Sequence, residues 1–150
     1  MPDAAAVTVE KLDRVTDEFV EAWARLIPQL SGAPAPAREH LEWVVGHEAN
    51  TVLVARDADG TIVGTTTLVT FPLATGIRAW IHDVVVDEAH RGRGVGSALT
   101  QAALREADAL GAWTVDLTTR PWRDDANRLY ARMGFERRET HVFRYSFHRF

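Results

Sequence analysis

Residues 84–105 read VVVDEAHRGRGVGSALTQAALR, and this stretch decides the fold. The run of valines predicts a buried strand, and the apolar spacing of the later residues predicts a helix over 95–110. Three glycines stand at alternate positions between the two elements. Glycine allows backbone conformations and close approaches that a Cβ would forbid. The stretch therefore predicts a strand, a tight turn and a long helix in succession.

The turn has the features of an anion-binding site. Gly92, Gly94 and Gly96 alternate there, with Arg91 and Arg93 interleaved. A helix that starts directly after them offers unpaired N–H groups and the positive end of its macrodipole, which together suit a phosphate or pyrophosphate. A tight turn without a ligand is the alternative. The motif in its strand-to-helix context favours ligand binding.

Two common phosphate-binding motifs are excluded by single residues. A Walker A loop ends in Gly-Lys-Ser/Thr, whereas this turn continues Gly96-Ser97-Ala98 without a lysine. The dinucleotide fingerprint G-x-G-x-x-G needs a third glycine where Ser97 stands. A phosphate ligand of this turn would therefore belong to another class.

The rest of the chain predicts one α/β domain over 1–150, because 150 residues can bury a single core and nothing in the composition marks a second domain. Asp13 or Thr16 would cap the first helix, and Gly111 would end the third. Besides the strand that runs over 78–87, the expected elements are strands at 7–12, 112–119 and 141–147, a hairpin at 51–71, and helices at 17–30, 37–48, 95–110 and 123–133.

Composition narrows the function classes. The net charge of −4 argues against a broad nucleic-acid surface. Because the chain has no cysteine, it has no disulfides, thiol nucleophiles or cysteine metal sites. The six histidines show no metal-ligand spacing, so we expect no bound metal. No apolar run approaches ~20 residues and the start lacks the pattern of a signal peptide. We expect a cytoplasmic protein without membrane contact.

The segment RGRGVG (91–96) resembles the Q/R-x-x-G-x-G/A signature of the GNAT superfamily, the acetyl-CoA-dependent N-acyltransferases. WIHDVVVD (80–87) resembles the strand that precedes this loop in that family, and NRLYARMGFERRE (127–139) is similar to its late helix, which ends in Y-x-x-x-G-F. The resemblance covers most of the chain and is strongest from about 78 to 147. It implies a fold of the α+β type, with a central mixed, mostly antiparallel sheet, helices on both faces, and splayed strands at the acetyl-CoA site.

The resemblance also implies the ligand and the residues that hold it. Acetyl-CoA would be the co-substrate, with its diphosphate on the amides of the turn and its pantetheine arm along the preceding strand like an added strand. The three valines can fill the core and bind ligand through their backbone at the same time, whereas Asn127 could instead cap within its helix. The implied binding residues are Val84, Val85, Val86, Arg91, Gly92, Arg93, Gly94, Val95, Gly96, Ser97 and Asn127.

Tyr130 matches the family's tyrosine, four residues before Gly134-Phe135. A phenol with an ordinary pKa of ~10 stays protonated at neutral pH and can donate to a departing thiolate. The resemblance therefore implies that Tyr130 is the catalytic acid. A core tyrosine packed against the sheet is the alternative.

The base is less clearly marked, because the family's W/Y-I-E-D arrangement reads Trp80-Ile81-His82-Asp83 here. His82 takes the place of the glutamate, and an imidazole with an ordinary pKa of ~6.5 is a competent base. Asp83 is the second candidate. Strict alternation puts Trp80, His82 and Val84 on one face of the strand and Asp83 on the other, so the two side chains cannot face one substrate without a bulge.

The function implied is transfer of an acetyl group from acetyl-CoA to a primary amine of a small molecule, by direct attack through a tetrahedral intermediate. A protein lysine or N-terminal acetyltransferase is one alternative, and a non-catalytic coenzyme A-binding sensor, favoured by His82 in place of glutamate, is another. The acceptor amine and the acyl chain stay open. Similar proteins often form homodimers, to which the strand expected at 141–147 could contribute.

Overall fold

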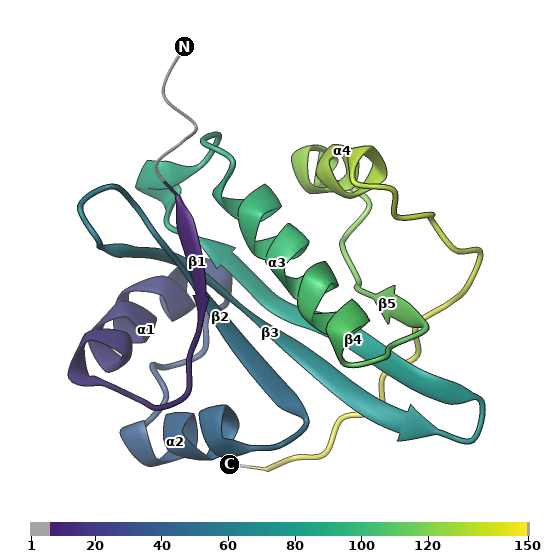
Figure 1. The fold of residues 1–150 in the computed structure, drawn as a ribbon, viewed down its shortest axis with the longest axis horizontal. Coiled ribbons are helices and arrows are strands. Elements are labelled where there is room, and N and C mark those ends of the chain that lie inside the picture. Colours follow the sequence, from purple (N-terminus) through teal and green to yellow (C-terminus); the bar gives the residue numbers. More distant parts are fainter. Residues whose placement is uncertain (1–6, 150) are drawn as a thin grey trace. The chain divides into compact units, whose positions relative to one another are not determined.

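The computed structural model describes residues 7–149 in two compact units, one up to Leu117 and one from Thr118. The first unit contains a five-stranded sheet in the order β1-β2-β3-β4-β5 (Figure 1). Its first four strands pair antiparallel, and β5 pairs parallel to β4. The sheet is thus mixed and mostly antiparallel, as predicted. The strands are β1 (Thr8–Lys11), β2 (Asn50–Arg56), β3 (Ile62–Leu73), β4 (Gly76–Val86) and β5 (Thr114–Asp116).

The helices of this unit begin and end close to the predicted positions. Thr16, one of the two predicted caps, accepts a hydrogen bond from the Phe19 N–H at 3.2 Å and so starts the first helix. In the described residues, no helix has both the length and the apolar character needed to cross a membrane. The elements are α1 (Asp17–Leu30), α2 (Arg38–Gly46), a short 3₁₀ turn η2 (Glu88–His90) and α3 (Val95–Ala109).

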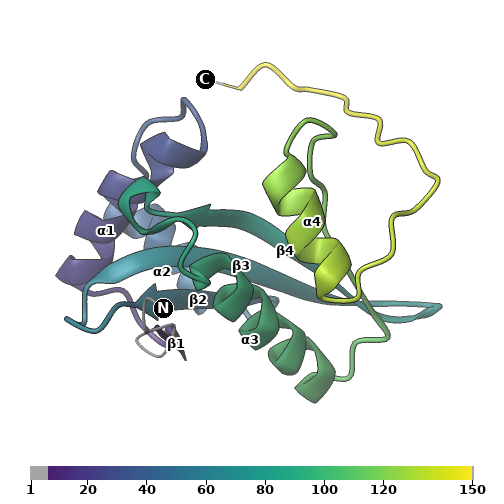
Figure 2. The ribbon, with the colours of Figure 1, turned by 90° about the horizontal axis from the view of Figure 1, so that it is seen from above.

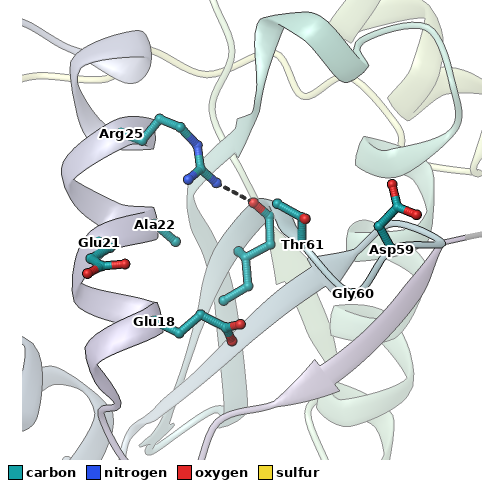
Figure 3. Close-up of a pocket in the computed structure, with 8 residues that line it drawn as sticks. Glu18, Glu21, Ala22, Arg25, Asp59, Gly60 and Thr61 are labelled. Carbon is teal, nitrogen blue, oxygen red and sulfur yellow. Dashed lines mark hydrogen bonds between the residues drawn. The ribbon is translucent and has the colours of Figure 1, made fainter.

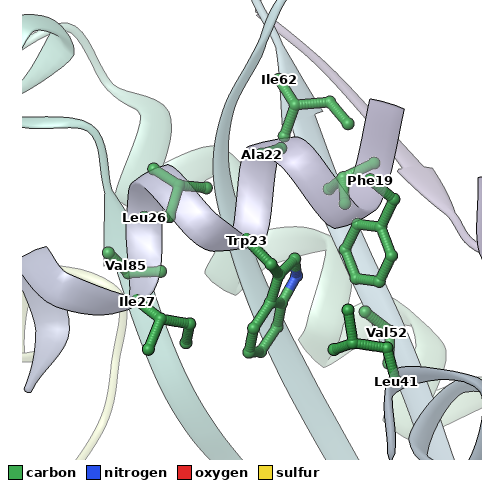
Figure 4. Close-up of a cluster of buried hydrophobic side chains, with 10 residues drawn as sticks. Phe19, Ala22, Trp23, Leu26, Ile27, Leu41, Val52, Ile62 and Val85 are labelled. Carbon is green, nitrogen blue, oxygen red and sulfur yellow. The ribbon is translucent and has the colours of Figure 1, made fainter. Parts of the chain in front are cut away.

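The sheet is covered by helices on both faces (Figure 2). On one face, buried side chains of α1 and Leu41 of α2 pack against Val52, Val54 and Val85 of the sheet (Figure 4). On the other face, α3 approaches β3 so closely that a Cβ on Gly64 would lie 3.0 Å from Val95 Cγ1. This arrangement confirms the predicted layers.

The second unit contains α4 (Asp124–Arg132), where a helix was predicted over 123–133. The predicted strand at 141–147 is wrong: residues 135–149 contain neither helix nor strand. The alternation that suggested it is present, since Tyr145 and Phe147 face each other at 5.1 Å between ring centroids. A strand also needs a neighbour for its backbone groups, and the side-chain pattern does not supply one.

Candidate functional site

Strands β4 and β5 separate partway along their length. They pair only from Arg78 with Thr114 to Trp80 with Asp116, and the Trp113 N–H donates to the Ile77 carbonyl just before, at 2.8 Å. Among the described residues, no strand pairs with this edge of β4 beyond Trp80. Residues 81–86 are therefore bonded to β3 on one side and present an open backbone edge on the other.

The backbone groups at this open edge follow from the register. The Ile77 carbonyl points toward β5, so alternation turns the polar groups of Ile81 the same way. Val85 pairs with Thr65, and the Asp87 N–H donates to the Val63 carbonyl, so these two residues turn toward β3. The backbone groups of Val84 and Val86 consequently point toward the open edge, where the family resemblance implies a bound pantetheine arm. The side chain of Val85 is buried in the core.

A β-bulge interrupts β4 at the start of this edge. Thr67 pairs with His82 and Thr65 with Val85, so β4 has one residue more than β3 across this interval. Asp83 lies in the bulge with φ of +54°, a left-handed conformation that is uncommon for a residue with a side chain. Strain of this kind is concentrated at functional sites. The bulge also corrects the simple alternation, because it places His82 on the same face as Val85.

Substitution of Asp83 tests this strain. Asp83→Gly is expected to raise the free energy of unfolding by about 0.5–1 kcal/mol relative to Asp83→Ala, because only glycine adopts the left-handed conformation without a steric penalty. Urea unfolding of the two variants measures the difference. Equal stability of the two would show that the backbone at Asp83 is unstrained.

His82 and Asp83, the two predicted bases, are both exposed at the bulge. The His82 ring stacks on Trp80, with 6.0 Å between ring centroids and 17° between planes. His82 also lies on the face of the sheet that α1 and α2 cover, because its partner Thr67 pairs with the core residue Val52. An accessible imidazole thus stands on that face beside the open edge.

The glycine turn forms the other part of the candidate site. Gly92 and Gly94 adopt φ of +76° and +81°, so both need glycine for their conformation. Gly94 precedes α3 and provides no side-chain cap, and the first bond of the helix runs from the Ala98 N–H to the Gly94 carbonyl. The N–H groups of Val95–Ser97 therefore have no acceptor within the helix. Gly96 and Ser97 lie in this first turn, and Arg91 and Arg93 are exposed.

Two residues of α1 that sequence reasoning missed hold the segment that leads into the glycine turn. Arg25 Nε lies 3.4 Å from Asp87 Oδ2, and Gln29 Oε1 accepts from the Glu88 N–H at 2.8 Å. Arg25 also donates to the Ile62 carbonyl, at a shallow pocket between α1 and the β2–β3 turn (Figure 3). That pocket contains no residue of the open edge or the glycine turn.

A second brace comes from the β2–β3 turn, where Asp57 Oδ2 lies 3.4 Å from His90 Nε2. His90 is the last residue of η2, directly before the glycine turn. The segment between the open edge of β4 and the start of α3 is thus held from two sides. No local pattern in the sequence marks these contacts, since the partners come from distant segments.

The second unit carries Tyr130 and Asn127. Tyr130 is half-buried, and burial raises the pKa of its phenol above the ordinary value. Its ring meets Phe135 edge to face, at 5.6 Å between centroids. Asn127 Nδ2 donates to the carbonyls of Arg123 at 2.9 Å and Arg120 at 3.2 Å, so its side chain bonds back to the segment where its own helix begins. The catalytic role of Tyr130 and the ligand role of Asn127 stay predictions.

The chain matches a known protein family and a curated relative in sequence. A model of the acetyltransferase (GNAT) family matches residues 13–135. The "Putative phosphinothricin acetyltransferase YwnH" of Bacillus subtilis (strain 168) is 36% identical over 80 residues, which are 52% of this chain and 49% of that protein. The chain thus matches about half the length of this curated relative.

Two solved structures share the fold. Glucosamine-6-phosphate N-acetyltransferase from Arabidopsis thaliana has a TM-score of 0.80 and 18% identity, covering 93% of this chain and 97% of that one. An aminoglycoside acetyltransferase from an uncultured soil metagenomic sample, in complex with sisomicin, has a TM-score of 0.78 and 20% identity, covering 95% and 97%.

Proposed function

The chain belongs to the acetyltransferase (GNAT) family, and from this membership we propose that it transfers an acetyl group from acetyl-CoA to a primary amine of a small molecule. The amine nitrogen attacks the thioester carbonyl directly, and the tetrahedral intermediate collapses with loss of the coenzyme A thiolate. The amine gives up a proton and the thiolate takes one up. The reaction requires a base, a donor for the oxyanion and an acid.

One observation carries the proposal: the open edge of β4 and the unpaired N–H groups at the start of α3 belong to one unit, joined by the short segment that contains η2. An extended arm that bears amides can bond to an open strand edge as an added strand. A diphosphate is favoured at a helix N-terminus by its N–H groups and its dipole. Both fit the chemistry of coenzyme A, with Val84 and Val86 facing the arm and residues 92–97 facing the diphosphate.

His82 is proposed as the base, since its exposed imidazole stands beside the open edge. Asp83 is the second candidate, directly next to it in the bulge. Tyr130 is proposed as the acid on the family resemblance and on its own surroundings, since burial raises the pKa of its phenol and keeps it protonated at neutral pH. No metal takes part in this proposal.

His82→Ala tests the choice of base. We expect kcat/KM to fall about tenfold near pH 7, because the group that accepts the amine proton has been removed. In a plot of kcat/KM against pH, the limb that rises with pH should also change. Asp83→Ala is the matched variant. If the pH profile of His82→Ala keeps that limb while Asp83→Ala loses it, Asp83 is the base.

The small-molecule acceptor is supported by the names of similar proteins, which give phosphinothricin, an aminoglycoside and glucosamine 6-phosphate as acceptors. The test is the release of free thiol from acetyl-CoA over a panel of amines that includes these three classes and a lysine peptide. Turnover of a small amine is expected. Turnover of the peptide alone would favour the protein acetyltransferase, and coenzyme A binding without any turnover would favour the sensor.

A further inference from the structure

We propose that Thr66 is a positioning residue for acetyl transfer, whose hydroxyl holds the bulge of β4 in the shape that presents a backbone N–H to the acyl donor. The inference rests on the proposed function. Thr66 lies on β3 between Thr65 and Thr67, the two residues that pair with β4 on either side of the bulge. It is therefore the residue of β3 that lies opposite the bulge.

The hydroxyl of Thr66 makes a specific bond there. Its Oγ1 donates to the His82 carbonyl at 2.9 Å, and the residue is fully buried. This carbonyl belongs to the peptide that joins His82 to Asp83. The bond therefore ties that peptide to β3 at the point where the regular ladder is interrupted.

The orientation of this peptide decides where the next N–H points. The C=O and N–H of a trans peptide point in opposite directions, and the chain has no cis peptide among its described residues. A His82 carbonyl held toward β3 turns the Asp83 N–H away from β3, toward the open edge. At that edge the N–H can donate to the oxygen that gains negative charge during attack.

The same hydrogen bond also helps to hold Asp83 in its left-handed conformation. A φ of +54° is unfavourable for a residue with a side chain and persists only where the surroundings enforce it. The Thr66 hydroxyl is a buried contact that fixes the peptide directly before Asp83. Without it, the His82–Asp83 peptide keeps only the ladder pairing of His82 with Thr67, and the direction of the Asp83 N–H is less firmly fixed.

The chain supplies a matched control on the same strand. The hydroxyl of Thr65 is also fully buried and donates to a carbonyl of a neighbouring strand, Leu53 O of β2, at 2.8 Å. That bond lies on the side of β3 away from β4. Thr65→Val and Thr66→Val thus remove the same kind of hydrogen bond with the same change in side-chain shape. Of the two bonds, only that of Thr66 reaches the bulge of β4.

The experiment compares Thr66→Val, Thr66→Ser and Thr65→Val. Thr66→Val is expected to lower kcat by about tenfold or more, with KM for acetyl-CoA within about threefold of wild type, because a small misorientation at the reacting atoms affects the transition state more than binding. Thr66→Ser retains the hydroxyl and should restore kcat. Thr65→Val should keep kcat within about twofold, although its melting temperature falls as much as that of Thr66→Val.

Amide NMR of the same variants provides a readout besides activity. The Asp83 and Val84 amide resonances should shift in Thr66→Val and return in Thr66→Ser. A folded Thr66→Val with wild-type kcat, or an equal kcat loss in Thr65→Val, would overturn the inference. Should Thr66→Val not fold, Thr66→Ala and Thr65→Ala take their places with the same expectations. Should the wild type turn over no amine, the proposed function fails, and unshifted amides in Thr66→Val would overturn the positioning role separately.

Discussion

Gly94→Glu is expected to weaken acetyl-CoA binding by at least about a hundredfold while the protein stays folded. Gly94 directly precedes α3, so the new carboxylate would lie among the N–H groups that face the diphosphate and repel it. A hundredfold loss corresponds to about 2.7 kcal/mol of binding free energy. A Cβ at this position meets no heavy atom within 4 Å, so the substitution destabilises the fold only by the left-handed backbone strain, about 1–2 kcal/mol.

Gly111→Glu is the matched control for this prediction. Gly111 follows the other end of α3 and has φ of +82°, nearly the same as Gly94, and its Cβ would make an ordinary contact of 3.6 Å with Ile77. The two variants therefore share the backbone strain and the added charge. Titration calorimetry should show affinity lost in Gly94→Glu alone. Equal affinities in the two variants would remove the turn from the binding site.

Tyr130→Phe is expected to lower kcat by about a hundredfold and to leave the Kd for acetyl-CoA unchanged. The phenol is proposed to protonate the departing thiolate, a general-acid contribution of typically 10²–10⁴-fold, and phenylalanine retains only its ring. Burial raises the pKa of Tyr130, so the protonated form is lost only as the pH rises above the ordinary value of ~10. The effect should therefore be undiminished across neutral pH.

The other tyrosine of the chain serves as the control. Tyr145 is 83% exposed, in the segment without regular structure, so Tyr145→Phe should leave kcat within about twofold of wild type. Steady-state kinetics and calorimetry on both variants separate turnover from binding. A Tyr130→Phe variant that turns over at the wild-type rate would exclude the phenol as the acid.

The helices and most strands could be predicted because their signals are local. The cap at Thr16 and the apolar face of α1 need only the spacing of nearby residues, and the structure confirms both. The glycine turn is equally local, since Gly92 and Gly94 adopt the left-handed conformations that a tight turn before α3 requires. The single-domain organisation over 1–150 stays a prediction.

The bulge and the strand ends could not be predicted from the sequence. The bulge at Asp83 is a property of the register between β3 and β4, which depends on how two strands meet. The short β5 has the same origin: residues 112–119 read as a strand, but only Thr114–Asp116 find a partner. The braces from Arg25, Gln29 and Asp57 join segments far apart in the chain, and periodicity contains no information about such pairs.

A crystal structure of the protein with acetyl-CoA tests the central claim most directly. We expect the diphosphate against the N–H groups of residues 92–97 and the pantetheine arm along residues 81–86 of β4, with the thioester beside the bulge at Asp83. Acetyl-CoA bound elsewhere, with the turn empty and the strand edge free, would contradict it.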